Sequence, residues 1–391
     1  MNRREFLVSA SMAAGAMASS ARARCESRKY KACLIADSKQ GGVGHSMHLA
    51  FGLRDDVAVV ALAEPDEGAR AKYGADAGVE RTYADYREML DKEHPDLVAI
   101  GPRWSIHHKE YILACAEVGA HGLIEKPLSV DLEEADAMMT AIGAKNLRWA
   151  IGFNVRSMPP IAHLKKLLWE ESLIGTILDA RGRGKEDARA GGEDLIVLGS
   201  HVLDLMAYLM DGAPGWCFSD ITVGGRPAKP EDVHDPTEGL GPVVGDRICA
   251  TYGFAAGVKG FFASMANPDG SGGRFGLDLY GSRGVVTIRI GDTPTIQWIP
   301  DSTWAPGGRD VAWQPLPHAP EFVQRDQAHE RNRWLVDDLI TSIEEGREPT
   351  VSLADGRRSQ EMIQAVFESY VQQRRVMLPL EARSHPLKRW Q

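Results

Sequence analysis

Cysteine pairs, long apolar runs and an excess of positive charge are all missing from this sequence. Its five cysteines are widely spaced and include no Cys-x-x-Cys pair, so it has no paired-cysteine motif. The apolar run from Val8 to Ser20 is shorter than the about 20 residues that a membrane span needs, so we expect no stable membrane insertion. The formal charge of −9 argues against a nucleic-acid partner.

The composition is that of an ordinary soluble globular protein, with 43% hydrophobic and 25% charged residues. No internal repeat or long low-complexity segment interrupts the 391 residues, which are enough for two domains. Cys33 and Cys115 lie in apolar runs and are predicted to be buried. In an oxidising compartment, Cys217 and Cys249 could form a disulfide.

The first residues have the pattern of an export signal. Arg3 and Arg4 precede a weakly apolar run, and the small-x-small site Ala21-Arg22-Ala23 follows it. This pattern is typical of a twin-arginine signal, so we expect residues 1–28 to be a leader and linker. Because this route exports folded proteins, often with a cofactor in place, it predicts a tightly held cofactor and a periplasmic or secreted location.

The next segment has the order of a dinucleotide-binding unit. We predict a strand over residues 30–37, a glycine loop over 38–44, a helix over 46–54 and a strand over 57–62. The glycines of the loop, which would let the backbone approach a pyrophosphate, are Gly41, Gly42 and Gly44. The loop does not read Gly-x-Gly-x-x-Gly, so the order of the elements carries more weight than the motif.

An acid follows the second strand. Glu64 lies 20 residues after Gly44, the spacing of a carboxylate that binds the adenosine ribose hydroxyls. A carboxylate there would repel a 2′-phosphate, so the sequence favours NAD over NADP. His45 and His48 flank the predicted helix start, where either could cap and pack the helix or take part in catalysis.

The alternation of strands and helices continues and predicts a doubly wound parallel sheet. The expected helices are 83–90, 109–118 and 132–142, and the expected strands are 97–100, 121–124 and 149–153. The residues that follow the strand ending at residue 100 are expected to border a nicotinamide ring: Pro102, Arg103, Trp104 and His108. His108 could instead cap the start of the next helix. Trp104, in the same loop, could instead be a contact between domains.

The strand 121–124 delivers the most informative motif, Glu125-Lys126-Pro127. Pro127 disfavours a helical backbone at Lys126, which therefore stays extended where the strand ends. A lysine at the carboxyl end of such a strand can point into the ligand crevice of an open α/β sheet. There its cation can hold a substrate oxygen and stabilise negative charge on it.

The second half is predicted to form an open, mostly antiparallel sheet. Apolar or alternating segments separated by glycine turns lie at 176–183, 247–254, 257–265, 275–280 and 284–290. Such a sheet offers a broad face for substrate and for subunit association. His234 has no partner at metal-ligand spacing, so no metal is expected. Arg156, Arg181, Arg183 and Lys185 could line the substrate crevice or end exposed strands.

Together these motifs resemble the glucose–fructose oxidoreductase/inositol dehydrogenase/MocA (Gfo/Idh/MocA) family. The matching segments are Ala63–Asp66, Tyr83–Tyr86, Gly119–Pro127, Gly152–Arg156, Leu198–Asp204 and the tail from Pro349 to Leu380. The resemblance implies a Rossmann domain over residues 29–150, an α/β domain over 151–391 and a homodimer or homotetramer. It also implies a nicotinamide cofactor bound by Glu125 and Lys126 among others, a sugar or polyol substrate, and His201 as general acid–base beside Lys126.

One position departs from the family pattern. Family dehydrogenases place an aspartate four residues before the histidine, where this chain has Val197. Glu193 or Asp194 could replace it only if the segment before Ile196 is not helical. Three functions therefore stay open: an NAD(P)-dependent oxidoreductase, a glycosidase or lyase that retains NAD and uses transient oxidation, and a non-catalytic sugar-binding or regulatory protein.

Overall fold

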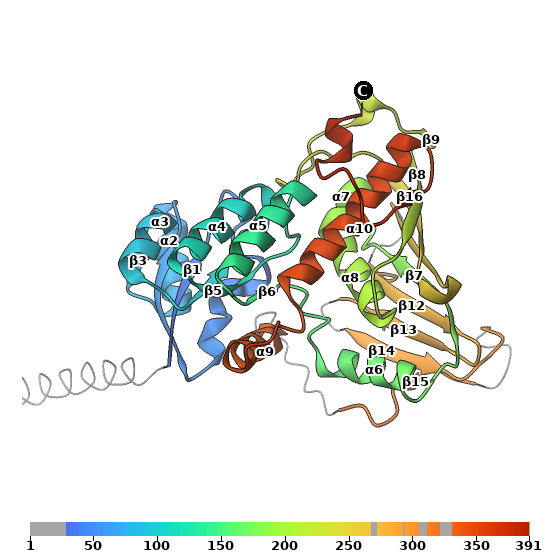
Figure 1. Cartoon of the computed structure of the whole chain (residues 1–391), viewed down its shortest axis with the longest axis horizontal. Coiled ribbons are helices and arrows are strands. Elements are labelled where there is room, and N and C mark those ends of the chain that lie inside the picture. The colour runs from blue at the N-terminus through green and yellow to red at the C-terminus, as the bar shows by residue number, and fades with distance from the viewer. Residues whose placement is uncertain (1–28, 267–271, 292–293, 305–310, 321–330, 391) are drawn as a thin grey trace, which may run out of the picture.

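Two sheets organise the chain (Figure 1). The structure, a computed structural model, describes residues 29–391 except 267–271, 292–293, 305–310, 321–330 and 391. The predicted leader therefore lies outside the described residues. Within them, none of the helices combines the length and apolarity that a membrane crossing requires.

The first sheet is parallel and has the order β3-β2-β1-β4-β5-β6, which confirms the predicted doubly wound architecture. Its strands are β1 (Tyr30–Ile35), β2 (Val57–Ala63), β3 (Arg81–Tyr83), β4 (Leu97–Ile100), β5 (His121–Ile124) and β6 (Trp149–Ile151). The helices are α2 (Glu67–Ala77), α3 (Tyr86–Glu93), α4 (His108–Val118) and α5 (Leu132–Ala144). The strand order reverses between β1 and β4, which is where such sheets bind their ligands.

The helix predicted over 46–54 is not formed. Two short 3-10 helices, η1 (Gly44–Leu49) and η2 (Phe51–Leu53), replace it. The backbone is left-handed at His45 (φ 44°) and Ser46 (φ 55°), and two such residues in a row cannot start an α-helix. The glycine loop therefore leads into an irregular turn, and the expected helical N–H donors are absent at this point.

The second sheet has ten strands in the order β15-β14-β13-β12-β7-β11-β10-β8-β16, with β9 beside β8. Only the β7–β11 pair is parallel among the described pairs, so the sheet is mostly antiparallel as predicted. The strands are β7 (Ile177–Arg183), β8 (Trp216–Val223), β9 (Arg226–Pro227), β10 (Arg247–Gly253), β11 (Lys259–Met265), β12 (Gly276–Gly281), β13 (Val285–Arg289), β14 (Thr295–Ile299), β15 (Gln314–Pro315) and β16 (Val376–Met377).

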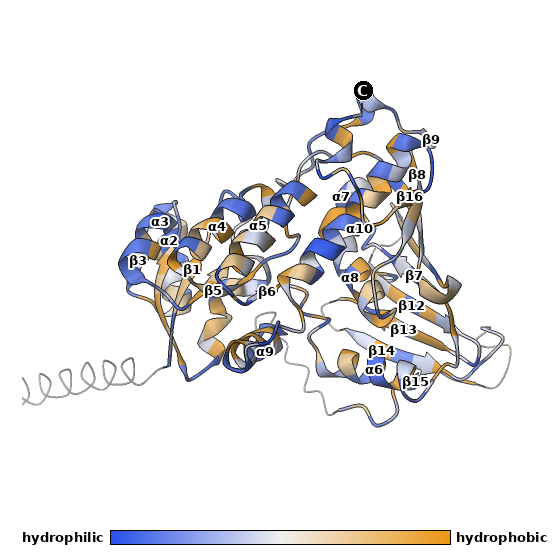
Figure 2. Ribbon diagram, viewed as in Figure 1, coloured by the Kyte–Doolittle hydropathy of each residue, from blue (hydrophilic) through white to orange (hydrophobic). Residues whose placement is uncertain are grey.

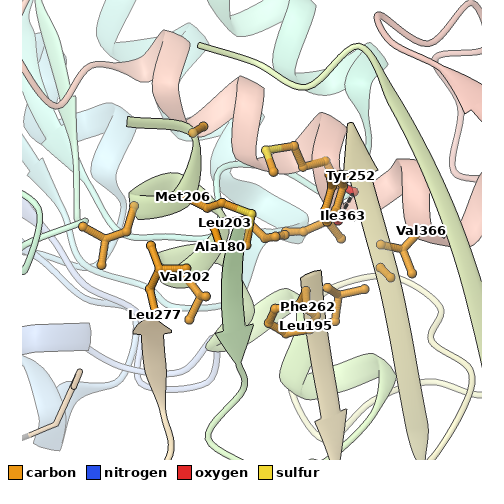
Figure 3. Close-up of a cluster of buried hydrophobic side chains, with 14 of the residues drawn as sticks. Ala180, Leu195, Val202, Leu203, Met206, Tyr252, Phe262, Leu277, Ile363 and Val366 are labelled. Carbon is orange, nitrogen blue, oxygen red and sulfur yellow. Dashed lines mark hydrogen bonds between the residues drawn. The ribbon is translucent and has the colours of Figure 1, made fainter. Parts of the chain in front are cut away.

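Helices cover one face of this sheet. They are α7 (Gly192–Val197), α8 (Gly199–Leu209) and α10 (Leu353–Gln372), while α6 (Pro159–Trp169) lies near β14 and β15 (Figure 1). Figure 3 shows the packing, in which Val202 of α8 lies beside Leu277 of β12, and Phe262 of β11 lies beside Leu195 of α7. Apolar residues concentrate on the strands and on the helix sides that face them (Figure 2), so burial fixes α8 against the sheet.

The remaining 3-10 helices are short connections. They are η3 (Ser105–His107), η4 (Pro230–Asp232), η5 (Ala255–Gly257) and η7 (Pro386–Lys388).

One helix from the second half returns to the first domain. Helix α9 (Asn332–Glu345) packs against β5 and β6, and Leu335, Val336, Leu339 and Ile340 belong to the first core. The sequence-based division placed all of residues 151–391 in the second domain, whereas the apolar face of α9 is buried in the first. A chain that leaves a domain and returns to it gives no boundary signal in the local sequence.

The possible disulfide is not formed. Cys217 of β8 lies opposite Tyr252 of β10, and Cys249 lies opposite Asp220. Cys217 is buried and Cys249 is exposed, so the two thiols point to opposite faces of the sheet. A disulfide requires side chains that point toward each other, so the register of these strands excludes it.

Candidate functional site

Lys126 is the second residue after β5 and is buried, with 4% of its surface exposed. The Lys126–Pro127 peptide bond is cis. The Nζ of Lys126 donates a hydrogen bond to the backbone carbonyl of Val197, 3.1 Å away at the end of α7. Burial lowers the pKa of this amine, while the nearby carboxylate of Glu125 opposes that shift. Two further N–H groups of the ammonium are available to a ligand.

Glu125 is fully buried and is used within the site. Its Oε1 lies 2.6 Å from Nδ1 of His45, and its Oε2 accepts from the backbone N–H of Lys126 at 3.0 Å. Burial works against the charge, but His45 and Lys126 outweigh it and hold the pKa of Glu125 below its usual value. The carboxylate therefore orients its neighbours rather than facing open solvent.

His201 lies on α8 and lines a cavity of about 310 Å³, which we call the His201 cavity. The described polar residues that line it are His45, Asn154, Lys185, His201 and Arg331. The ring of His201 stands edge-on to His45, with centroids 5.8 Å apart, and to Phe153, at 5.6 Å. Burial, and then the charges of Lys126 and His45, hold its pKa well below the usual 6.5, so the imidazole is neutral.

Neither acid near Val197 replaces the missing aspartate. Because α7 is helical through Val197, Glu193 and Asp194 face away from His201 toward other partners. Glu193 accepts from the backbone of Thr237 at 3.2 Å. Asp194 accepts from Ser264 at 2.5 Å and from the backbone N–H groups of two neighbouring residues. The family position of the carboxylate is therefore filled by a backbone carbonyl that holds Lys126.

The glycine loop fits a dinucleotide. Gly41 and Gly42 have φ values of 84° and 70°, which side chains rarely allow. A Cβ on Gly44 would lie 2.6 Å from atoms of both Arg103 and Glu125, so no larger residue fits there. The exposed Arg103 donates to the carbonyl of Gly41 at 2.9 Å and brings a cation beside the bare backbone. Bare backbone and an adjacent guanidinium suit a pyrophosphate.

Glu64 occupies the position predicted for a ribose-binding acid, but its carboxylate is already engaged. The side chain is fully buried and accepts from the backbone N–H and hydroxyl of Ser38, at 2.8 and 3.0 Å. It also accepts from the backbone N–H of Asp66 at 3.0 Å. Ribose hydroxyls would have to compete with these bonds. In this structure the carboxylate of Glu64 holds the start of the glycine loop through Ser38.

Pro102 and His108 hold two loops together instead of bordering an open pocket. His108 is fully buried, and its ring nitrogens lie 2.8 and 3.1 Å from the carbonyls of Pro102 and Leu128. Burial lowers the pKa of this histidine. The side chain of Trp104 packs between Gly41 and Gly239 and is a contact between the domains, one of its two expected roles. The loop after β4 is thereby fixed.

Two of the arginines expected in the crevice have other partners. Arg156 is buried and pairs with Asp204 at 3.1 Å and with Asp355 at 2.5 Å. Arg183 pairs with Glu186 and is not among the described lining residues of the His201 cavity. The guanidinium of Arg156 therefore joins α10 to the loop after β6, and a role of either arginine in substrate binding stays a prediction.

Three polar lining residues were not identified as substrate contacts from the sequence: His45, Asn154 and Arg331, whereas Lys185 was one of the expected crevice residues. For His45 the signal was its position directly after the glycine loop. Arg331 precedes α9 and enters the cavity only because that helix returns to the first domain, so no local pattern could reveal it. Within the described ranges no cluster of three or more His, Cys, Asp or Glu side chains could hold a metal ion.

Comparisons with known proteins agree with this architecture. The profile of the GFO_IDH_MocA oxidoreductase family, NAD-binding Rossmann fold, matches residues 40–153, and that of its C-terminal alpha/beta domain matches residues 181–378. Levoglucosan dehydrogenase from Pseudarthrobacter phenanthrenivorans is 27% identical, over 82% of this chain and 89% of its own. D-apiose dehydrogenase from Paraburkholderia graminis is 24% identical, over 83% and 84%.

Solved structures show the same fold. Levoglucosan dehydrogenase in complex with NADH and levoglucosan superposes with a TM-score of 0.69 at 23% identity, over 90% of this chain and 99% of the other. Aldose-aldose oxidoreductase from Caulobacter crescentus gives 0.68 at 19%, over 90% and 100%. The chain therefore belongs to the Gfo/Idh/MocA family of oxidoreductases, with an NAD-binding Rossmann domain and the family's C-terminal α/β domain.

Proposed function

We propose that this oxidoreductase oxidises a secondary hydroxyl of a sugar or polyol, with NAD as the tightly bound hydride acceptor. The observation that carries the proposal is the buried Lys126, held at the end of β5 beside a cavity that two histidines line. The names of the relatives, which are levoglucosan and D-apiose dehydrogenases, support a carbohydrate substrate. NAD, when bound, supplies the acceptor for the hydride.

The residues of the chain handle the oxygen and its proton. Lys126 keeps one N–H on the carbonyl of Val197 and turns the others toward the reacting oxygen, where the cation stabilises developing negative charge. An imidazole of the His201 cavity accepts the hydroxyl proton. The sequence points to His201 for this step, and His45 faces it across the same cavity.

The open sheet supports self-association. Leu178, Phe218 and Phe261 are 44%, 49% and 38% exposed on the face that α8 and α10 leave uncovered. Phe218 and Phe261 flank Thr251 on adjacent strands, so the patch is continuous. Exposed apolar patches of this kind mark interaction sites. We propose that a second copy of the chain covers this patch in a homodimer or homotetramer.

We also propose that the protein is exported by the twin-arginine route, because Arg3 and Arg4 precede an apolar run and a small-x-small site.

Mass spectrometry of the nucleotide released on denaturation tests the cofactor, and we expect NAD rather than NADP. The purified protein is then incubated with sugars, cyclitols and glycosides while nicotinamide absorbance and product mass are recorded. Stoichiometric reduction of the bound cofactor supports the proposal. Release of an aglycone without net reduction would instead indicate transient oxidation by a glycosidase or lyase, and ligand binding without chemistry would indicate a sugar-binding protein.

A further inference from the structure

His45 and His201 line the same cavity, but only His45 has a carboxylate partner. Nδ1 of His45 lies 2.6 Å from Oε1 of Glu125, which is fully buried. The ring of His201 contacts the rings of His45 and Phe153, and within the described parts of the chain its nitrogens have no hydrogen-bond partner. An imidazole with a buried carboxylate on one nitrogen has a fixed tautomer and a stabilised cation.

The backbone is arranged to present His45. Its φ of 44° and ψ of 27° are left-handed, which is uncommon for a residue with a Cβ. Its carbonyl accepts from Nδ2 of Asn332 at 2.9 Å, at the start of α9. This loop conformation leaves 28% of the His45 side chain exposed and turns its ring toward the cavity and the buried carboxylate. Strained backbone held by surrounding contacts is characteristic of functional positions.

The surroundings of His201 disfavour its protonation. Lys126, His45 and Arg331 are the charged or titratable groups whose fields reach it, and all of them oppose a second positive charge. Asp204, three residues after His201, pairs with Arg156, and Glu193 and Asp194 are bound to other groups. A base that receives a proton here would form an unpaired buried cation, which is costly.

We propose that His45, oriented by Glu125, is the acid–base residue of this site, and that His201 is a neutral residue that positions the substrate by hydrogen bonding. The proposal rests on the proposed dehydrogenase function. It explains how the chain can lack the aspartate at position 197, because the carboxylate that supports the imidazole comes from β5 rather than from α7. One carboxylate oxygen of Glu125 therefore orients His45, and the other accepts from the backbone N–H of Lys126.

The proton follows a short path. The O–H proton of the alcohol goes to Nε2 of His45, while the hydride leaves the same carbon with its two electrons for the nicotinamide cofactor. The carbinol thereby becomes a carbonyl. The Nδ1–H of His45 keeps its hydrogen bond to the carboxylate of Glu125, and this carboxylate stabilises the imidazolium that forms. The charged or titratable groups around His45 are Glu125, Lys126, His201, Arg103 and Arg331.

His45→Asn tests the proposal. Asparagine tolerates the left-handed backbone and can donate to Glu125, but it cannot accept a proton. We expect kcat to fall by about 10²–10⁴-fold while the bound nucleotide remains. The rise of kcat/KM with pH should also disappear, because that rise reports deprotonation of the base. His48→Asn is the matched control, since His48 packs beside Tyr73 away from the cavity, and its activity should match the wild type.

Two further measurements keep the proposal falsifiable. His45→Gly relaxes the backbone and removes the ring, so added imidazole should restore part of the activity, whereas it should not restore activity to His201→Gly. In the resting protein, the hydrogen-bonded Nδ1–H of His45 should give a downfield proton NMR signal that is lost in Glu125→Gln, independently of any turnover.

The contrary result is equally clear. Retention of kcat and of the pH profile in His45→Asn, together with their loss in His201→Asn, would return the acid–base role to His201 and overturn the proposal. A wild-type protein that releases no nucleotide and reduces none with any sugar would defeat the proposed function instead. The NMR signal of the Nδ1–H would still report whether Glu125 bonds to His45.

Discussion

The two sides of the His201 cavity are built from different kinds of contact. On the side of the first domain, His45 lines the cavity and contacts the buried carboxylate of Glu125, which also accepts from the backbone N–H of Lys126. On the side of the second domain, His201 is held by ring contacts, and Val197 contributes only its backbone carbonyl. Our proposal accordingly places proton transfer on the first domain, while His201 and Lys185 complete the cavity from the second.

The largest effect should come from Lys126→Met, which removes the cation but keeps a long apolar side chain. We expect kcat/KM to fall by about 10³-fold, because the negative charge that develops on oxygen loses its partner. Bound nucleotide, measured by mass spectrometry after denaturation, should remain. Lys92→Met is the control, since that ammonium pairs with Glu88 on the surface of α3. Full turnover by the Lys126 variant would remove this residue from the mechanism.

A smaller effect is expected on assembly. Phe261→Ser takes an aromatic ring from the middle of the uncovered sheet face. If that face is a subunit interface, loss of a central aromatic side chain reduces the binding free energy by about 2 kcal/mol, which raises the dissociation constant roughly 30-fold. Analytical ultracentrifugation measures it, with Met377→Ser on the edge strand β16 as control. An unchanged oligomer, or a wild-type monomer, would show that the sheet face is not the interface.

His201→Asn sharpens the contrast between the two histidines. A residue that only positions substrate should raise KM more than it lowers kcat, and the loss of one hydrogen bond predicts a change of about tenfold. The pH profile of kcat/KM should keep its shape. A loss of kcat as large as that of His45→Asn would place both imidazoles in the proton transfer, and steady-state kinetics at several pH values distinguishes the two cases.

Two buried carboxylates extend the comparison to stability. Neighbouring bases lower the pKa of Glu125 despite its burial, whereas burial raises the pKa of Asp204 to about 7 although Arg156 pairs with it. Above pH 3.8, the usual pKa of an aspartate, the unfolded chain releases the proton of Asp204, whereas the folded state keeps it up to about pH 7. Asp204 should therefore reduce the unfolding free energy as pH rises from about 4 to about 7, by at most about 1.4 kcal/mol per pH unit.

Glu125 has the opposite sign. Its lowered pKa gives a contribution that is complete above about 4.3 and is lost as pH falls through the folded-state value. Urea unfolding at a series of pH values measures both effects. Asp204→Asn should flatten the decline toward neutral pH, and Glu125→Gln should weaken the loss of stability in acid. The same slope in Asp204→Asn as in the wild type would contradict the assignment of that proton.

Local patterns were reliable where burial is regular and failed where caps or distant contacts decide. Helix α2 was not expected, because most of its residues are exposed and it has no clear apolar face. Its caps were readable all the same, with Asp66 accepting from Ala69 at one end and Gly78 at a φ of 68° at the other. The helix predicted over 46–54 failed for the opposite reason, since its pattern was apolar but its start is held left-handed by distant partners.

The sequence by itself determined the doubly wound sheet and the position of Lys126, because strand patterning and a proline after the lysine act over a few residues. The tertiary structure alone decided that His45 contacts a carboxylate and that Arg156 forms buried ion pairs. His45 and Glu125 are 80 residues apart, and Arg156 and Asp355 are 199 apart. Such pairs form because whole elements are brought together by burial of their apolar faces, and that information is spread over the entire chain.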